Sequence, residues 1–377
     1  MLSLASSLRA RLECSNDFGE RFCTKQFCGN LTNSQNWRVM LGIVADGLDE
    51  RIMRITRSIW NYRPSAPLRN SPLFEWPLNP RAAIWWVVRR WVHISSYVVF
   101  AACALGVYFF VQPEMSTMKT LSFDWVALIY VRNLVLMIVI TGALHLRLVT
   151  FGMQGQKLKF DARDMVKNNA AFTFKNQVYD NMFWSIASGV TAWTFFEVLF
   201  FWAAANGYAS VLLFRENPIL SASALVWIPI LSSMHFYWIH RLLHWPPLYR
   251  RVHSLHHRNL NIGPWSGMSM HPVESFGYMS ALLLHFVIPT HPFFVLLHFY
   301  TKAMGPSFSH AGFEKVLLKD EKGIDAGDFH HQLHHRFFEC NYGTLEMPWD
   351  KWFGSFHDGT DSANERIKKR RQRIRQQ

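Results

Sequence analysis

The sequence predicts an all-α, integral-membrane protein with about four transmembrane helices and a cytoplasmic helical cap that is rich in histidine. Three observations support this fold class. Half of the 377 residues are hydrophobic and only 17% are charged, whereas charged residues make up about a quarter of a typical soluble domain. The apolar residues gather in blocks close to the ~20 residues that a helix needs to cross a bilayer. The histidines gather in three closely spaced clusters within residues 240–335.

Four apolar segments are expected to span the membrane. They are Val92 to Val111, Trp125 to Leu146, Phe183 to Ala205 and Ile219 to Ile239. The first and the fourth carry no charge, but the second contains Arg132 and the third contains Glu197. A charge at the centre of a spanning helix costs about 2.5–3.5 kcal/mol on insertion scales. We therefore expect both charged side chains to face protein rather than lipid.

Lysine and arginine are distributed unevenly over the segments that flank these spans. They are frequent before the first span, between the second and the third, and after the fourth, whereas the other two loops contain only Lys119 and Arg215. Positive residues favour the cytoplasmic side of a membrane. The N-terminus and the histidine-rich half are therefore expected to be cytoplasmic, at the endoplasmic reticulum of a eukaryote or the inner membrane of a bacterium.

Three regions are expected along the chain. Residues 1–80 are polar and proline-rich, which predicts a peripheral, partly disordered N-terminal region. Residues 81–360 should form the membrane-embedded domain that holds the histidine clusters. Residues 361–377 form a basic tail, in which seven of the ten residues 366–375 are basic. Such a tail suits a membrane surface, and it is equally compatible with a solvated, disordered segment.

The net charge of +13 is compatible with binding either to nucleic acid or to anionic lipid headgroups. The apolar blocks decide in favour of lipid. We therefore expect a membrane partner and no nucleic-acid partner.

The three histidine clusters have the spacing of metal ligands. Their members are His240 and His244, then His253, His256 and His257, and finally His331, His334 and His335. Residues three or four apart share one face of a helix, so each cluster can direct two or three nitrogens toward a common point. A single pair would be more typical of packing, but three clusters with such spacing indicate metal binding.

The number of histidines indicates more than one metal ion. Eight ligands exceed the three or four of a zinc site. Arg241 follows the first histidine, where a zinc protease has glutamate, and the Glu-x-x-His pattern of soluble di-iron bundles is missing from these clusters. Imidazole suits iron, zinc and copper alike. The residues thus predict two ions that share eight to ten imidazoles, and they leave the metal open.

A fifth apolar stretch, Phe276 to Tyr300, lies between the second and third clusters and is interrupted by Pro289 and Pro292. Proline removes a helical hydrogen bond and clashes with the preceding turn. Because His257 and His331 must reach one side of the membrane, the stretch is expected to turn back as an interfacial or re-entrant hairpin.

The clusters resemble the histidine boxes of the fatty acid hydroxylase and sterol desaturase superfamily, whose pattern is HX3H, HX2HH and a final HX2HH. The resemblance covers about residues 225–360. His-Pro-Val-Glu at 271–274 is similar to an element of the sterol-oxidising branch, and Ser-His-Ala-Gly at 309–312 to the extra histidine region before the last box. Residues 341–343 and 349–355 resemble the segment that follows this box in sterol C-5 desaturase-like members.

The resemblance implies a pair of iron ions held by histidines. Carried over residue by residue, it makes the eight cluster histidines ligands and adds His271 and His310 as the ninth and tenth. His330, Glu274 and Asn341 are candidates for residues that support the ligands from behind. The resemblance implies no catalytic residue beyond the metal ligands.

The resemblance also implies a function. The chain should be an O2-dependent lipid oxidase that hydroxylates or desaturates an unactivated C–H bond, with a lean toward a sterol-like substrate and with fatty-acyl or aminolipid hydroxylation as an alternative. The lipid should come from the bilayer into an apolar cavity, for which Trp265, Met268 and Met270 are candidate wall residues. Electrons should come from cytochrome b5 or from a ferredoxin with its reductase, because the sequence contains no Cys-x-x-Cys or glycine-rich dinucleotide motif.

A different class of function is a metal transporter or a non-catalytic membrane protein that binds metal. Transporters place their sites near the middle of the membrane, often between inverted repeats. Here the clusters begin at the end of the fourth predicted span, and the sequence contains no visible repeat.

Overall fold

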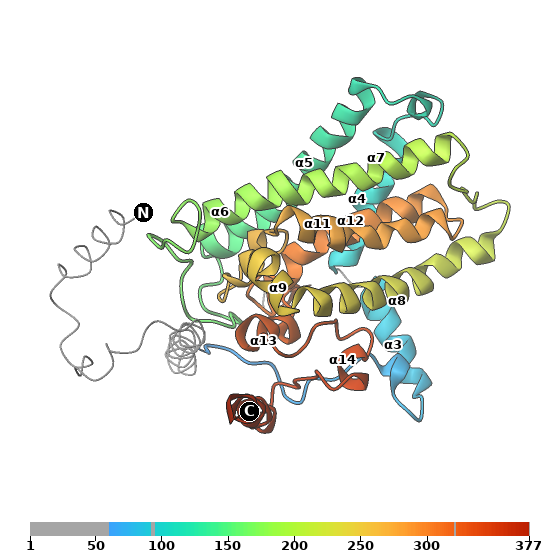
Figure 1. Ribbon diagram of the computed structural model, residues 1–377. Helices are drawn as coiled ribbons and strands as arrows, with labels where there is room; N and C mark the ends of the chain where they lie inside the picture. The colour runs from blue at the N-terminus through green and yellow to red at the C-terminus, as the bar shows by residue number, and fades with distance from the viewer. Residues whose placement is uncertain (1–59, 92–94, 320–321, 377) are drawn as a thin grey trace, which may run out of the picture. The chain divides into compact units, whose positions relative to one another are not determined.

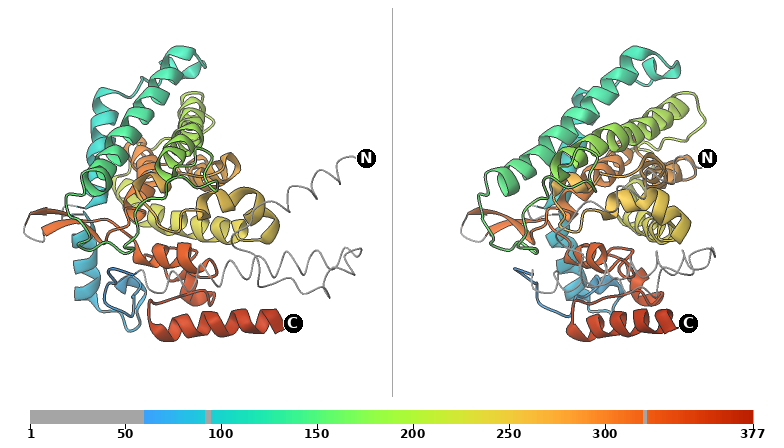
Figure 2. Two further views of the ribbon diagram at one scale, coloured as in Figure 1. Left: turned by 90° about the vertical axis from the view of Figure 1, so that its left-hand side faces the viewer. Right: turned by 60° about the vertical axis from the view of Figure 1, so that its left-hand side comes forward.

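The computed structural model describes residues 60–91, 95–319 and 322–376 (Figures 1 and 2). This part of the chain is mostly helical, as predicted. Residues 1–59, which make up most of the predicted peripheral region, lie outside the described residues.

Three continuous helical segments are long and apolar enough to cross a membrane. The first joins α5 (Phe123–His145) to the π-helical turn η3 (Leu146–Thr150). The second joins α6 (Gln177–Trp184), the π-helical turn η4 (Ser185–Val190) and α7 (Thr191–Ala205). The third is α8 (Pro218–Leu243). These three correspond to the second, third and fourth predicted spans.

The first predicted span is shorter than expected. Its helix α4 (Ser96–Phe110) has 15 residues, which at 1.5 Å per residue extend over about 22 Å and fall short of the ~30 Å of a hydrocarbon core. The hydroxyl of Ser95 caps its start, accepting a hydrogen bond from the Val98 N–H. The described residues therefore contain three candidate spans rather than four.

The apolar stretch around Pro289 turns back, as expected. Helix α11 (Pro272–Met279) and the 3-10 helix η7 (Ser280–Phe286) form one arm, and α12 (Pro292–Ser309) forms the other. His285 and His298 connect the arms, with His285 Nε2 2.9 Å from His298 Nδ1.

The remaining elements are short, apart from α3 and α15. They are η1 (Pro72–Phe74), α3 (Pro80–Trp91), η2 (Thr117–Lys119), α9 (Pro246–Leu248), η5 (Tyr249–His253), α10 (Ser254–His257), η6 (Pro264–Ser266), β1 (Lys315–Lys319), β2 (Lys322–Asp325), α13 (Phe329–Phe337), α14 (Trp349–Trp352) and α15 (Asp361–Gln376). The antiparallel pair β1–β2 corrects the all-α prediction in one detail. Val316 on β1 is buried in the hydrophobic core.

Arg132 and Glu197 face protein, as predicted. The two side chains are 6% and 0% exposed and form an ion pair between α5 and α7. Asn133 donates a hydrogen bond to the second carboxylate oxygen of Glu197 at 3.0 Å, and Gln112 accepts one from Arg132 at 2.9 Å. Each charge thus has a charged partner and a polar neighbour, which is what a buried ion pair requires.

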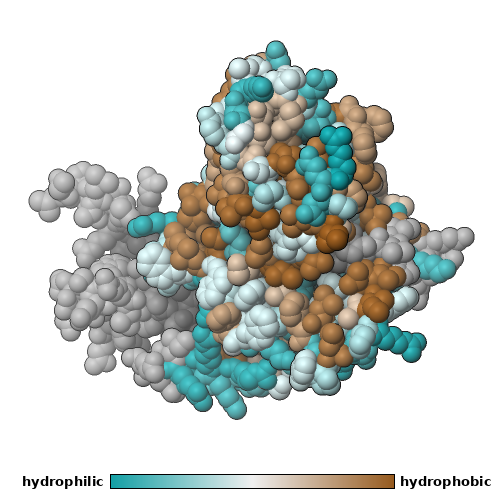
Figure 3. All heavy atoms as spheres, turned by 90° about the vertical axis from the view of Figure 1, so that its right-hand side faces the viewer, coloured by the Kyte–Doolittle hydropathy of each residue, from teal (hydrophilic) through white to brown (hydrophobic). Residues whose placement is uncertain are grey.

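Many large apolar side chains are exposed on the helices. Phe110 at the end of α4, Phe123 at the start of α5 and Ile219 at the start of α8 are each more than four-fifths exposed. Figure 3 shows hydrophobic residues over the middle of one face and hydrophilic residues along its lower end. Apolar exposure on this scale is typical of a surface that contacts lipid.

The basic tail forms a helix, α15, rather than a disordered segment. Arg371 anchors it by donating a hydrogen bond to the Phe337 carbonyl at 2.6 Å and by pairing with Glu339 at 3.1 Å. Helices α13, α14 and α15 lie at the same end of the described structure (Figures 1 and 2). The tail therefore lies beside the helix that carries the last histidine cluster.

Candidate metal centre

Nine histidines converge on two adjoining groups. The first group consists of His240, His244, His253, His257 and His334, and the second consists of His256, His310, His331 and His335. Within each group the candidate ligand atoms all lie within 4.8 Å of one another. The rings of His257 and His335, 4.7 Å apart, connect the two groups.

The first group joins the end of α8 to α10 and α13. His240 lies in the last turn of α8, and its Nε2 is 3.1 Å from that of His253. His334 Nε2 lies 3.2 Å from His244 Nε2 and 2.9 Å from His257 Nε2. His244 is half-buried, and the other four residues are buried.

The second group is centred on His310, which directly follows α12 as its C-cap. Its Nε2 lies 3.1 Å from that of His331, 3.2 Å from that of His335 and 3.4 Å from that of His256. His331 and His335 are one turn apart on α13, with their Nε2 atoms 3.2 Å apart. All four residues are buried.

The two HX2HH clusters are divided between the groups in a reciprocal way. In the second cluster, His253 and His257 belong to the first group and His256 to the second. In the third cluster, His331 and His335 belong to the second group and His334 to the first. Each cluster thus contributes its i and i+4 residues to one group and its i+3 residue to the other.

Backbone carbonyl oxygens behind three of the histidines determine which ring nitrogen carries the proton. His240 Nδ1 lies 2.7 Å from the Tyr342 carbonyl oxygen, and His334 Nδ1 lies 2.6 Å from that of Cys340. His310 Nδ1 faces the Pro306 carbonyl oxygen at 2.9 Å. A carbonyl oxygen can only accept, so Nδ1 carries the proton in these rings and Nε2 presents a lone pair to the group.

Burial keeps the histidines uncharged. Desolvation lowers the pKa of His256 to about 4 and, together with the neighbouring imidazoles, lowers the pKa of His257 and of His335 well below the usual value. His331 and His334 shift in the same direction for the same causes. At neutral pH these rings are therefore neutral, as metal ligands must be.

The donor set fits a pair of metal ions. Unprotonated nitrogens 3 Å apart repel one another unless a cation lies between them. A metal–nitrogen distance of about 2.1 Å places two ligands at right angles about 3.0 Å apart, and the Nε2 atoms in each group are separated by such distances. Two groups with five and four imidazoles match two ions better than one.

His271 is not brought to either group, although it was predicted as a ligand. Its Nδ1 accepts a hydrogen bond from the Val273 N–H at 3.2 Å and so caps the start of α11. The residue that reaches the first group from α11 is Glu274, in the first turn of the helix, with Oε1 2.7 Å from His253 Nδ1.

The three residues that were expected to support the ligands make different contacts. Glu274 contacts a ligand directly. His330 turns away from the groups, with Nε2 3.6 Å from Asp350 Oδ2. Asn341 braces the chain behind α13, because its amide donates to the His330 and His357 carbonyls at 3.0 and 3.1 Å.

Sequence reasoning gave no role to Asp350, which organises the loop behind the first group. Its carboxylate accepts hydrogen bonds from the Tyr342 and Gly343 N–H groups, each at 2.8 Å, and from the Ser355 hydroxyl at 2.7 Å. This loop presents the Tyr342 carbonyl to His240. The resemblance of residues 349–355 was the one available signal for it.

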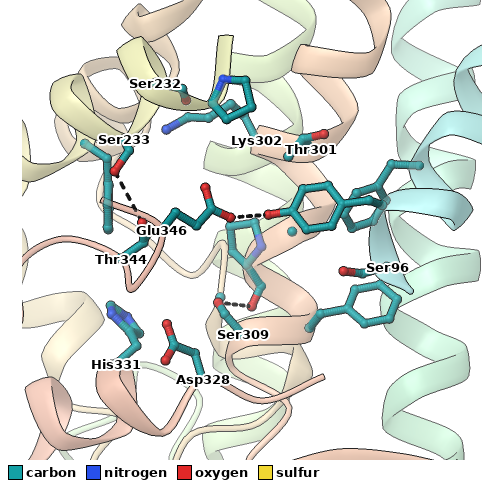
Figure 4. A pocket seen from close by; sticks show the side chains of 18 of the residues that line it. Ser96, Ser232, Ser233, Thr301, Lys302, Ser309, Asp328, His331, Thr344 and Glu346 are labelled. Carbon is teal, nitrogen blue, oxygen red and sulfur yellow. Dashed lines mark hydrogen bonds between the residues drawn. The ribbon is translucent and has the colours of Figure 1, made fainter. Parts of the chain in front are cut away.

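A cavity of about 640 Å³ adjoins both groups, within the range of roughly 300–1,000 Å³ typical of small-molecule sites. His240 and His253 of the first group and His256, His310 and His331 of the second line it. The other walls are largely apolar and come mainly from α4, α8 and α12, with contributions from α11 and from residues 343–346 (Figure 4).

Of the three expected wall residues, Met270 lines the cavity. Trp265 and Met268 are buried outside it, and Met268 packs against Gly189 of η4. The apolar wall opposite the histidines is therefore formed mainly by the helices.

Glu274→Ala is expected to weaken metal binding by roughly 10–100-fold, the usual effect of removing a partner that orients a ligand. Without the carboxylate, His253 Nδ1 loses the acceptor that holds its ring. Glu274→Gln keeps an acceptor oxygen and should retain most of the affinity. Titration of the purified, metal-free variants with Fe2+ measures the effect, and equal affinities for both variants and the wild type would contradict it.

The comparisons with known proteins agree with this geometry. Residues 225–355 match the family model described as fatty acid hydroxylase. A Delta(7)-sterol 5(6)-desaturase of Saccharomyces cerevisiae is 32% identical over 129 residues, which are 33% of this chain and 34% of that protein. One from Candida albicans is 27% identical over 172 residues, 43% of this chain and 42% of that protein.

Lathosterol oxidase of Homo sapiens is 32% identical over 133 residues, which are 33% of this chain and 42% of that protein. The chain thus spans less than half the length of these three relatives. No solved structure matches it.

Proposed function

We propose that this chain, whose residues 225–355 belong to the fatty acid hydroxylase and sterol desaturase superfamily, is an O2-dependent oxidase of a membrane lipid. It would hydroxylate or desaturate an unactivated C–H bond, with a sterol-type molecule as the substrate. One observation carries the proposal: nine imidazoles, eight of them buried, form two adjoining groups, and five of the nine line one end of a largely apolar cavity. The names of the relatives support the sterol class.

Two iron ions would be held by the nine histidines, five around one ion and four around the other. When bound, the iron pair supplies the activation of O2 and the removal of hydrogen from the lipid, which no amino-acid side chain can perform. The protein's contribution is to bind, to orient and to exclude water. The carbonyls of Tyr342, Cys340 and Pro306 hold the ligand rings in one tautomer.

The apolar walls orient the substrate by its shape. Phe236 of α8 and Phe308 of α12 line the cavity near the histidines, so a rigid hydrocarbon would be held against aromatic faces. Filling the cavity with lipid removes water from the histidine groups, which suppresses side reactions.

Purified protein is expected to contain about two iron ions per chain, because nine imidazole ligands exceed what one ion can bind. Elemental analysis of the protein measures the stoichiometry. In parallel, mass spectrometry of lipids from cells with and without the gene should detect a product that is 16 Da heavier or 2 Da lighter than its precursor. A stoichiometry near one iron, with all nine histidines intact, would contradict the two-ion assignment.

We further propose that the metal centre and the C-terminal helix α15 lie on the cytoplasmic side, where a soluble or membrane-bound electron donor can reach them. The distribution of lysine and arginine supports this orientation. The basic helix α15, beside α13, would suit an acidic donor such as cytochrome b5 or a ferredoxin. Protection of a C-terminal tag from protease in sealed, cytosol-side-out vesicles would contradict it.

A further inference from the structure

The cavity contains a second polar region away from the two histidine groups. It is formed by Ser232 and Ser233 on α8 and by Thr301 and Lys302 on α12. Lys302 lies beside the two serines, on the opposite side of the cavity from His331 (Figure 4). We call these four residues the polar patch.

The polar patch lies two helical turns from the metal centre on both helices. Ser232 precedes His240 by eight residues on α8, and Lys302 precedes His310 by eight residues on α12. At 1.5 Å per residue this corresponds to about 12 Å along each helix axis. The patch is therefore separate from the ligand groups.

Lys302 is a buried amine that has no acidic partner, and burial lowers its pKa to about 7. It is 5% exposed, and no acidic side chain of the described residues forms an ion pair with it. The carboxylates of Glu274 and Glu346, which also line the cavity, are engaged by His253 and Tyr97. Burial of an unpaired charge is costly unless a ligand compensates it.

Aromatic rings fix the position of the ammonium group. Nζ of Lys302 lies 3.6 Å from the centre of the Tyr278 ring and 5.4 Å from that of Phe236, which are favourable cation–π contacts. Pro306 has no N–H, so the Lys302 carbonyl lacks its helical partner. The Tyr278 hydroxyl donates to this carbonyl at 3.0 Å and thereby holds its ring against the lysine.

A buried chain of polar groups ends at Ser232. Thr290 Oγ1 lies 3.0 Å from His285 Nδ1, and His285 Nε2 lies 2.9 Å from His298 Nδ1. His298 Nε2 in turn lies 3.1 Å from Ser232 Oγ. Because histidine and hydroxyl groups can each donate or accept, Ser232 can offer a ligand either role.

We propose that Lys302, together with Ser232, binds the oxygen-bearing group of the lipid substrate. The group is an oxygen that accepts hydrogen bonds, either the hydroxyl of a sterol or the carboxylate of a fatty acid. The hydrocarbon then extends past Phe236 and Phe308 to the histidines. This inference rests on the proposed function for the presence of a lipid, and it adds which end of the lipid the protein recognises.

Direct binding to purified protein tests the proposal without any turnover. Radiolabelled cholesterol is compared with cholestane, which lacks the hydroxyl, and palmitate is compared with hexadecane. The wild type should prefer the oxygen-bearing member of one pair by about tenfold or more, the usual effect of a hydrogen bond to a charged group. Preference for cholesterol assigns the site to a sterol hydroxyl, and preference for palmitate assigns it to a carboxylate.

Lys302→Met keeps the length of the side chain and removes the cation. This variant should bind the oxygen-bearing probe and its hydrocarbon about equally. Its elution on size exclusion and its bound iron should be unchanged. Lys119→Met, at an exposed lysine outside the cavity, is the matched control and should bind as the wild type does. Lys302→Arg, which keeps the charge, should retain most of the preference.

Two results would overturn the proposal: a wild type that prefers neither oxygen-bearing probe, or a Lys302→Met variant that keeps the full preference. Failure of the proposed function would appear instead as missing iron and missing lipid product, which this binding assay does not measure.

Discussion

His310→Ala is expected to abolish lipid oxidation and to lower the bound iron, whereas His271→Ala is expected to preserve both. His310 is the centre of the second group, with its Nε2 within 3.4 Å of three other imidazole nitrogens. Its removal leaves that group with three ligands and an unfilled space beside the cavity. His271 contacts neither group, and its loss removes only an N-cap hydrogen bond worth ~1 kcal/mol.

The two variants form a matched pair, because both replace one histidine by the same residue in the same domain. Turnover and iron content are measured on the same preparations, with His256→Ala as the standard for the loss of a ligand. Full iron and substantial activity in His310→Ala would remove that residue from the ligand set. Complete inactivity of His271→Ala with normal folding would restore the prediction from the sequence.

Glu197→Leu is expected to destabilise the protein by about 3–5 kcal/mol, the cost of leaving a buried charge without its partner. Arg132 is 6% exposed on its side chain, and Glu197 is the acidic side chain that pairs with it. Asn133 would also lose one acceptor. The double variant Arg132→Met/Glu197→Leu removes both charges and should recover much of the stability.

Thermal unfolding of the purified variants in one detergent, followed by tryptophan fluorescence, measures these effects. Bound iron and turnover of the double variant should approach those of the wild type, since the pair lies outside the cavity. A single variant as stable as the wild type, or a double variant no more stable than the single one, would contradict the expectation.

The spacing in the sequence predicts eight of the nine histidines of the metal centre. It does not predict which of the two groups each histidine joins. Successive residues of an α-helix are rotated by about 100° around its axis. Relative to residue i, residue i+4 is therefore rotated by about 40° in one direction and residue i+3 by about 60° in the opposite direction. Helical geometry thus separates His256 from His253 and His257. Which group each residue joins depends on the packing of α13 against α10, and nothing in the local sequence specifies that.

Other features depend on contacts that leave no pattern in the sequence. The outer partners of His240 and His334 are backbone carbonyls, and every residue has one. His271 has the residue type of a ligand, but it caps α11 and leaves the contact with His253 to Glu274. Helix α4 covers residues 96–110 of the first predicted span, with Ser95 capping its start and Val111 its end, and a run of apolar residues does not mark these caps.

The reciprocal division of the clusters has a consequence for how the protein is assembled. Both groups need residues of α13: the first needs His334, and the second needs His331 and His335. A chain is synthesised from its N-terminus, and its early elements fold first. The three candidate spans end at Leu243, well before α13 is made. Neither group is complete until α13 has been synthesised, so the metal ions that we propose would be bound only after the three candidate spans have been made.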